Sequence, residues 1–217
     1  QYMELPGNVV KILEGLPDLK GAAVASWITF GGKGTNPINT GWNLLEIMAK
    51  KGGAPVGMQT FCNMNTYSPS WSMSDKGKAR VLEYRNLPNE KTFEQCRAYG
   101  EELLGRVKNG QMIEVGSDFD LSALLVYVHS RWWTKKLINE HFIDKQKCFQ
   151  CGTCTNTCPV GAVNYEAYTI DRDKCIACFG CLNNCPAGAM TMEFMGDPLY
   201  GFIELCRREK IQIADPP

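Results

Sequence analysis

The chain has 217 residues, of which 23 are basic and 23 are acidic, so its formal net charge is zero. A neutral chain offers no electrostatic argument for nucleic acid or an anionic membrane as its partner. The longest apolar run, Leu121–Val128, is far shorter than the roughly 18 residues of a membrane-spanning helix. We therefore expect no nucleic-acid partner and no membrane span.

The first two thirds of the chain alternate between predicted strands and predicted helices. Apolar runs predict the strands, and periodic stretches with capping residues predict the helices. In chain order we expect helix Val9–Leu16, strand Gly21–Trp27, a loop over Ile28–Thr40, helix Trp42–Lys51, strand Ala54–Phe61 and a polar loop over Asn63–Lys78. Asn89 then caps a helix that runs to about Lys108, and a further helix begins at Ser117 and continues through His141. This order predicts an α/β layer fold.

Cysteine is concentrated in the last third of the chain. Eight of the eleven cysteines lie between Cys148 and Cys185, and they belong to an internal repeat. Residues 144–162 align with residues 171–189 at a shift of 27, with ten of nineteen positions identical. The repeat predicts two similar half-sites related by a pseudo-twofold axis, each made of a short strand, a loop and a helical turn. Cysteines this close together suit metal ligation and indicate a reducing, anaerobic cytoplasm.

Each half of the repeat has the spacing Cys-x2-Cys-x2-Cys-x3-Cys-Pro, which is typical of [4Fe–4S] ligation. Three thiolates on a tight loop reach one cluster, whereas the fourth points away and binds the other cluster. One cluster is therefore expected at Cys148, Cys151, Cys154 and Cys185, and the other at Cys175, Cys178, Cys181 and Cys158. Small residues such as Gly152 and Ala177 let backbone amides approach the cluster sulfurs and tune the potential.

Zinc is the alternative for the same eight thiols, as two four-cysteine sites. Zinc sites usually pair two Cys-x2-Cys hooks that lie far apart in the sequence, and this repeat does not. Loss of one iron to give a three-iron cluster is a second alternative. The remaining cysteines, Cys62, Cys96 and Cys206, have no partner at ligand spacing and are expected to be inert thiols.

The cysteine segment resembles the bacterial ferredoxins with two [4Fe–4S] clusters at all eight cysteines and at Pro159 and Pro186. The whole chain resembles a looser family, fusions of a flavodoxin-like domain to such a ferredoxin module. That resemblance is carried by residues 5–11, 21–27, 29–32, 50–53 and 196–204. It implies a partial flavodoxin-like domain at 1–112, a linking helix at 113–142, a ferredoxin module at 143–194 and a C-terminal tail at 195–217. The implied fold class is a flavodoxin-like α/β domain with a partial parallel sheet, followed by an α+β module.

The flavodoxin-like resemblance also implies FMN as a cofactor of the complete protein. Its ring would contact Thr29, Phe30, Gly31 and Gly32, in the loop after the central strand. The family's phosphate-binding loop is missing from this sequence, so roughly the first half of the flavodoxin-like domain is expected to lie outside it. A half sheet would expose a strand edge and an apolar face, which the missing part or a partner is expected to cover.

The leading functional hypothesis is a cytoplasmic electron-transfer protein that relays single low-potential electrons through two [4Fe–4S] clusters to or from a flavin or a redox partner protein. A flavin-dependent reductase is one alternative, and a docking or electron-transfer subunit of a larger oxidoreductase complex is another. The sequence contains no His, Ser or Cys–His arrangement and no nucleotide-binding fingerprint that would favour a self-contained active site.

Overall fold

The computed structural model describes residues 5–32, 36–116 and 131–213. The described residues form two compact units. The sheet unit consists of residues 5–32, 36–63 and 87–116, and the cysteine unit consists of residues 64–86 and 131–213. Segment 64–86, which was expected inside the first domain, thus groups with the cysteine repeat. The boundary expected at residue 112 does not coincide with this division.

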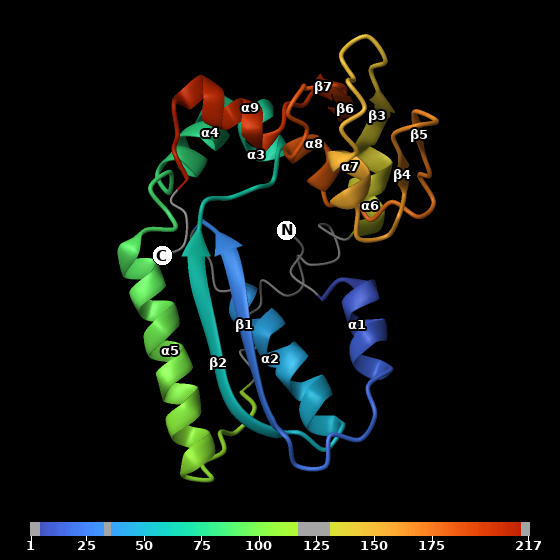
Figure 1. Ribbon diagram of the computed structural model, residues 1–217. Helices are drawn as coiled ribbons and strands as arrows, with labels where there is room; N and C mark the ends of the chain where they lie inside the picture. Colours follow the sequence, from blue (N-terminus) through green and yellow to red (C-terminus); the bar gives the residue numbers. More distant parts are fainter. Residues whose placement is uncertain (1–4, 33–35, 117–130, 214–217) are drawn as a thin grey trace. The chain divides into compact units, whose positions relative to one another are not determined.

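The sheet unit is built on two parallel strands, β1 (Ala23–Gly31) and β2 (Ala54–Asn63). Helix α2 (Asn36–Lys50) connects them and lies behind β1 in Figure 1. Met58 of β2 packs toward α2, because a Cβ on Gly41 of that helix would touch it. A Cβ on the preceding Gly57 would instead touch Tyr99 of α5 (Glu90–Lys108). Since successive strand residues point to opposite faces, α2 and α5 cover opposite faces of β2.

The predicted cap of α5 is confirmed. The Asn89 side chain accepts a hydrogen bond from the Thr92 backbone N–H, and the Thr92 hydroxyl accepts one from the Asn89 N–H, so the two residues form a capping box. The helix ends at Lys108, as expected. Tyr99 fixes α5 to the sheet by donating its hydroxyl hydrogen to the Ser26 carbonyl at 3.0 Å. The first helix of the unit, α1, spans Gly7–Glu14.

The loop expected over Ile28–Thr40 is shorter than predicted. Strand β1 continues to Gly31, because Ile28, Thr29 and Phe30 are β-branched or aromatic residues that suit a strand. Helix α2 begins at Asn36, because Pro37 is well suited to the first turn of a helix. Three of the four residues expected to contact FMN therefore lie in β1, and only Gly32 follows it, with a left-handed φ of 92°.

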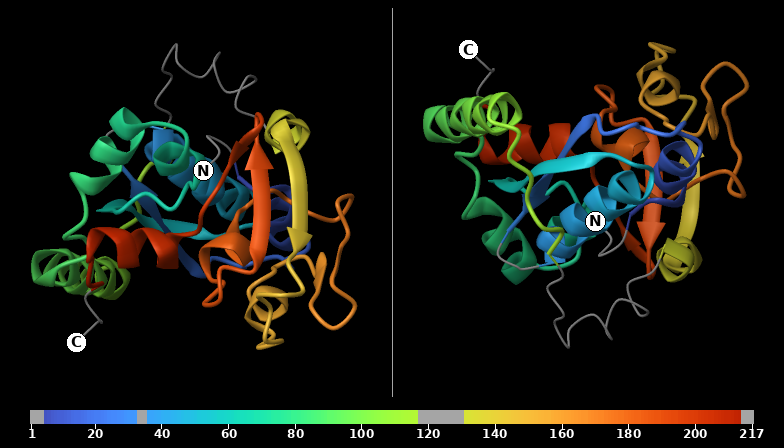
Figure 2. Two further views of the ribbon diagram at one scale, coloured as in Figure 1. Left: turned by 90° about the horizontal axis from the view of Figure 1, so that it is seen from above. Right: turned by 90° about the horizontal axis from the view of Figure 1, so that it is seen from below.

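The cysteine unit contains two small antiparallel sheets that enclose most of its core. The strands of the first are β3 (Ile138–Ile143), β6 (Met190–Phe194) and β7 (Asp197–Pro198), and those of the second are β4 (Val163–Asn164) and β5 (Thr169–Ile170). Figure 2 shows β3, in yellow, beside β6, in orange, with their arrows opposed. Two single-turn helices, α7 (Thr153–Asn156) and α8 (Gly180–Asn183), occupy equivalent places in the repeat.

The expectation of a helix through His141 is wrong at its end. Helix α6 spans Arg131–Leu137, and the chain then forms strand β3, which carries His141. The start of the expected helix, residues 117–130, lies outside the described residues. The reason for the change is pairing with β6, because His141 lies opposite Met192 and Ile143 lies opposite Met190. A distant strand has overridden a local helical pattern.

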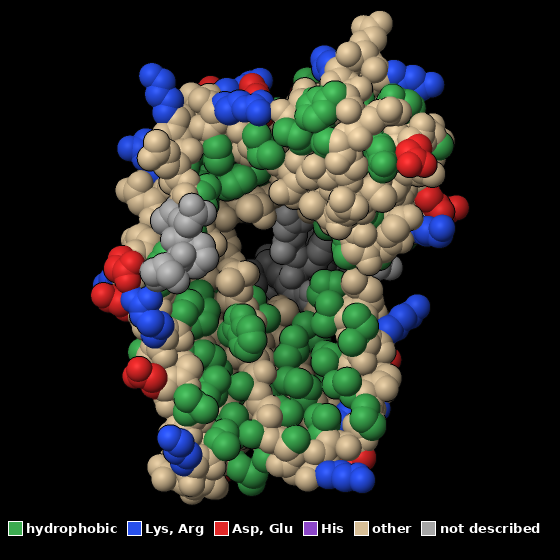
Figure 3. Space-filling view, in the orientation of Figure 1, with side chains coloured by type: hydrophobic (Ala, Val, Ile, Leu, Met, Phe, Trp, Pro, Cys, Tyr) green, Lys and Arg blue, Asp and Glu red, His purple; other side chains and the backbone are tan. Residues whose placement is uncertain are grey.

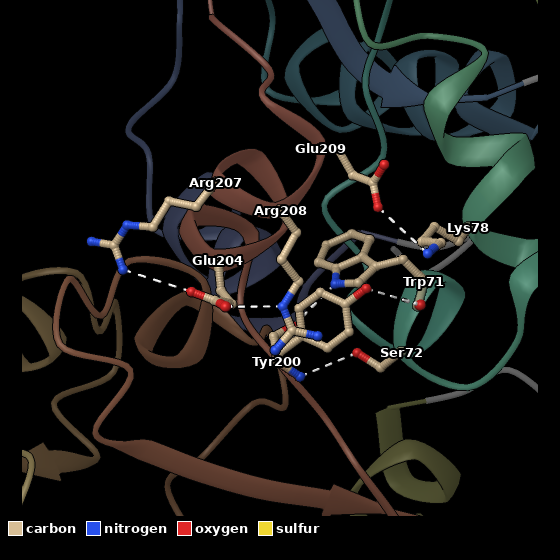
Figure 4. A network of polar contacts seen from close by, with 8 residues as sticks. All are labelled: Trp71, Ser72, Lys78, Tyr200, Glu204, Arg207, Arg208 and Glu209. Carbon is tan, nitrogen blue, oxygen red and sulfur yellow. Dashed lines mark hydrogen bonds and ion pairs between the residues drawn. The ribbon is translucent and has the colours of Figure 1, made fainter.

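Segment 64–86 also differs from the polar loop expected over Asn63–Lys78. It contains two short helices, α3 (Pro69–Ser72) and α4 (Asp75–Leu82), which contact the last helix, α9 (Phe202–Glu209). Figure 4 shows how polar contacts join them. The Tyr200 N–H donates to Ser72 Oγ at 3.1 Å, and Lys78 pairs with Glu209 at 3.4 Å. The Trp71 indole N–H donates to the Tyr200 carbonyl at 3.0 Å. The loop was predicted from its polar residues, but Trp71 is buried by long-range packing.

Hydrophobic side chains gather over the β1–β2 sheet on the face drawn in Figure 3. Trp27 of β1 is 61% exposed. Among the described residues, no helix has the length and apolar character needed to cross a membrane.

Candidate metal centre

Each half of the repeat begins with the same aspartate turn. Asp144 accepts a hydrogen bond from the Gln146 N–H at 2.9 Å, and Asp171 accepts one from the Asp173 N–H at 3.0 Å. Each aspartate also pairs with a lysine, Lys147 at 3.1 Å and Lys174 at 3.4 Å. The contact with Lys147 lowers the pKa of Asp144, and a hydrogen bond from the Lys174 N–H lowers the pKa of Asp171. These turns set the direction in which the chain enters each cysteine loop.

The two cysteine loops share an unusual backbone. Residues with left-handed φ stand at matching positions, Gln150 and Gly152 in the first loop and Ala177 and Phe179 in the second. This geometry turns backbone N–H groups back toward the thiols. The Gln150 N–H lies 3.4 Å from Cys148 Sγ, and the Ala177 N–H lies 3.4 Å from Cys175 Sγ. A small residue such as Gly152 was expected in each loop so that backbone amides could approach the cluster sulfurs. The equivalent position of the second loop is Phe179, however, whose buried ring packs in the core.

The fourth cysteine of each half is held by a different amide. The Ala162 N–H lies 3.2 Å from Cys158 Sγ, and the Ala189 N–H lies 3.2 Å from Cys185 Sγ. Amide donors favour the thiolate form of a cysteine, because they stabilise negative charge on sulfur. Four of the eight thiols therefore already have a backbone donor of the kind that a metal-bound thiolate accepts.

The first cavity combines cysteines of both halves. It opens to solvent. Its cysteines are the three of the first loop and the last of the second half: Cys148, Cys151, Cys154 and Cys185. Phe149 also lines it and is 64% exposed. A hydrogen bond with Thr153 lowers the pKa of the exposed Cys151 thiol.

The second cavity has the reciprocal composition. Its cysteines are Cys175, Cys178, Cys181 and Cys158. This cavity is lined by more buried groups, among them Met192 of β6 and Phe179. The side chain of Cys181 is 8% exposed, and burial raises its pKa. The structure thus brings together the same two sets of four thiols that the spacing predicted.

His141 also lines the second cavity. Its Nε2 lies 3.4 Å from Cys181 Sγ. Burial, together with the nearby Arg172 guanidinium, lowers the pKa of His141 to about 4. Sequence reasoning missed this residue because it was assigned to a helix. The available signal was Ile143, which matches Ile170 at the repeat's shift of 27 and marks a strand before each aspartate turn.

Asn183 ties the second loop to the rest of the cysteine unit. Its Oδ1 accepts hydrogen bonds from the Ser68 hydroxyl at 2.7 Å and the Phe202 N–H at 3.1 Å. Its side-chain amide donates to the Thr66 carbonyl at 2.8 Å. Tyr67, from the same segment, packs edge-on against Phe179 at 5.4 Å between ring centroids. Segment 64–86 therefore covers α8, which carries Cys181 and ends two residues before Cys185.

The donor sets fit an iron–sulfur cluster. Each cavity presents four thiols from its walls, with amide hydrogens directed at some of the sulfurs, which is the chemistry that [4Fe–4S] clusters require. Within the described residues, no three His, Cys, Asp or Glu side chains gather closely enough to hold a single metal ion.

Comparison with known families matches residues 140–186 to the 4Fe-4S dicluster domain. No curated protein and no solved structure matches the chain significantly. The matched segment covers about a fifth of the chain and contains all eight clustered cysteines. It supports at least one [4Fe–4S] cluster and an iron–sulfur electron-transfer role. The flavodoxin-like resemblance of residues 1–112 has no such match and stays a prediction.

Proposed function

We propose that this chain binds two [4Fe–4S] clusters and relays single electrons through them to or from a redox partner. The observation that carries the proposal is the pair of cavities, each lined by three cysteines of one loop and one cysteine of the other half. Each bound cluster supplies a site that accepts and releases one electron.

The residues that line the two cavities support a ligand assignment. Cys148, Cys151, Cys154 and Cys185 hold the first cluster, and Cys175, Cys178, Cys181 and Cys158 hold the second. Thiols spread over the walls of a cavity suit a group that is larger than one ion. This favours clusters over zinc, whose ligands all lie about 2.3 Å from a single centre.

The stoichiometry of metal and sulfide tests the proposal. Protein purified without oxygen is expected to contain roughly eight iron and eight acid-labile sulfide per chain, because each [4Fe–4S] cluster contributes four of each. The proposal also includes potentials in the low range for such clusters, below about −300 mV, since no histidine replaces a cysteine ligand. About two zinc per chain without sulfide would refute the proposal.

A second proposal concerns flavin. The carboxyl ends of β1 and β2 lie side by side, since Thr29 pairs with Phe61 and Gly31 pairs with Asn63. Ligands of open α/β sheets bind at this edge. We propose that Thr29, Phe30, Gly31 and Gly32 contact the ring of an FMN in the complete protein, which would exchange electrons with the clusters.

Acid release tests the flavin proposal on the full-length protein purified under anaerobic conditions. Stoichiometric FMN in the supernatant supports it, and Phe30→Ala should lower the FMN content, whereas Ile12→Ala, a change at an exposed residue of α1, should not. A full-length protein without flavin would make the sheet unit a docking domain. The chain would then be a two-cluster carrier or a subunit of a larger oxidoreductase.

A further inference from the structure

The cysteine sulfurs of the two cavities have different polar side chains beside them. In the first cavity the Thr153 hydroxyl lies 3.3 Å from Cys151 Sγ. In the second cavity a histidine nitrogen, His141 Nε2, lies 3.4 Å from Cys181 Sγ. The side chains that line the first cavity include no histidine, and its polar aromatic residue, Tyr165, directs its hydroxyl to Glu166 at 3.3 Å. At the repeat's shift of 27, the residue that corresponds to His141 is Tyr168, which does not line the first cavity.

The direction of the His141 contact follows from chemistry. A cysteine that binds a cluster has lost its proton, so its sulfur can only accept a hydrogen bond. The hydrogen between the two atoms must then belong to Nε2 of the imidazole. A donor to a cluster sulfur stabilises the reduced cluster more than the oxidised one, because the reduced cluster carries one more negative charge.

Contacts with β6 and Arg172 hold the strand that carries His141 in place. The residue lies on β3, which pairs with β6, and its register partner Met192 is almost completely buried. Arg172 holds the beginning of the same strand, since its guanidinium donates to the Asn139 carbonyl at 3.2 Å and to the Ile138 carbonyl. Because these contacts fix the backbone that carries His141, little further conformational freedom is lost when its side chain makes a hydrogen bond.

We propose that His141 is a positioning residue that donates a hydrogen bond from Nε2 to Cys181 Sγ and thereby raises the reduction potential of the second cluster above the value it would have without this contact. The inference rests on the proposed two-cluster function. It changes the electron affinity of only one of the two half-sites, which have the same ligand spacing. Which cluster holds an incoming electron then depends on a residue outside the cysteine motif.

The main test is a pair of variants whose potentials are measured for each cluster. His141→Phe keeps an aromatic ring but removes the N–H, and His141→Gln restores an N–H donor. Tyr168→Phe, at the corresponding position of the repeat, is the matched control. Redox titration under anaerobic conditions, followed by paramagnetic NMR of the cysteine β-protons, resolves the two clusters. Iron and sulfide content is measured first, so that absence of clusters, which would refute the proposed function, is distinguished from failure of this inference.

In His141→Phe we expect the ratio of reduced second cluster to reduced first cluster, at a fixed potential, to fall about three- to tenfold, the size of one lost hydrogen bond. That is a shift of roughly 30 to 60 mV for a one-electron couple. His141→Gln should recover part of the shift, and Tyr168→Phe should leave both potentials unchanged. Intact clusters with an unchanged ratio in His141→Phe, or equal shifts of both clusters, would overturn the proposal.

A measurement on the unaltered protein covers the case in which His141→Phe loses its clusters. The chain contains two histidines, His129 and His141, so ¹⁵N-histidine labelling marks few nitrogens. Electron–nuclear double resonance of the reduced protein should detect one coupled histidine ¹⁵N, and this coupling should persist in His129→Gln. Absence of the coupling, or its loss in His129→Gln, contradicts the proposal.

Discussion

The two cavities have the same ligand spacing and very different surroundings. Cys151 and Phe149 of the first loop are exposed, whereas their counterparts Cys178 and Ile176 in the second loop are partly buried. The backbone does not cause the difference, because left-handed residues stand at matching positions of both loops. The difference comes from what packs against each loop: segment 64–86 and α9 cover α8.

The comparison separates the role of the cysteine motif from the role of the residues that pack around it. The cysteine spacing determines which thiols face which cavity, while residues far away in the sequence determine how much solvent reaches the cavity. Burial lowers the reduction potential of a cluster, because the reduced form carries more charge, and exposure raises it. In the second cavity the proposed His141 hydrogen bond would act against the effect of burial. We therefore expect contacts outside the repeat to contribute to the difference between the two potentials.

Removing a crossing cysteine should have the largest effect. Cys158 belongs to the first half but lines the second cavity, so Cys158→Ala should eliminate or damage the second cluster and spare the first. Cys185→Ala is the reciprocal variant and should damage the first cluster. Iron analysis should give about four iron per chain in each variant. Site-resolved NMR that finds Cys158→Ala affecting the cluster of its own loop would show that the ligands do not cross.

The next largest effect is expected at the residue that anchors the second loop. Asn183→Ala removes three hydrogen bonds, to Ser68, Phe202 and Thr66, and leaves buried partners unsatisfied. We expect a loss of about 2–3 kcal/mol, or roughly 5–10 °C in the thermal midpoint for a chain of this size.

Asn156 is the matched control for Asn183. It occupies the same position in the first half, but it is exposed. Asn156→Ala should change the thermal midpoint by less than about 2 °C. Circular dichroism of the cluster-loaded proteins at one scan rate compares the variants, since loss of the clusters makes unfolding irreversible. Equal midpoints for the two variants would mean that α8 is not anchored by Asn183.

The cysteines that share a cavity could be predicted from the sequence because the spacing of the motif is a local feature. Three thiols within seven residues must converge, and the repeat places the fourth in the other half. The parallel strands and the cap at Asn89 could be predicted for the same reason, since each depends on neighbouring residues. Local patterns are sufficient where the structure is held by contacts close in the sequence.

The parts that sequence reasoning missed depend on distant contacts. Ser68 and Asn183 are 115 positions apart, and no local pattern marks the segment around Ser68 as part of the cysteine unit. The helix expected through His141 failed because β6, about fifty residues later, supplies the strand partner. The flavin site is a prediction from family resemblance alone.

Because the first cavity is exposed, its cluster should be more sensitive to oxidants and iron chelators than the second cluster. Limited ferricyanide oxidation, or incubation with an iron chelator, should degrade the first cluster several-fold faster than the second, because solvent reaches Cys151 and Phe149 directly. Electron paramagnetic resonance should detect a three-iron intermediate. NMR should place this intermediate at the site of the first cluster, formed by Cys148, Cys151, Cys154 and Cys185. Asn183→Ala should uncover the second loop and so reduce the difference between the degradation rates of the two clusters. Faster degradation of the second cluster would show that the first cavity is not the more accessible of the two.

The smallest effect should be found where the two halves are alike. Asp144 and Asp171 each accept backbone hydrogen bonds in the turn before a loop, and the fold lowers the pKa of both. A lowered carboxyl pKa contributes stability that is present above the ordinary value of 3.8 and is lost as the pH falls through the folded pKa. The contribution is therefore complete at pH 7. Asp144→Ala and Asp171→Ala should lower the thermal midpoint at pH 7 slightly and equally, and Asp144→Asn, which keeps an oxygen acceptor, should lower it less. A much larger loss in Asp171→Ala would mean that the asymmetry of the two halves begins in the turns themselves, before segment 64–86 and α9 pack against the second loop.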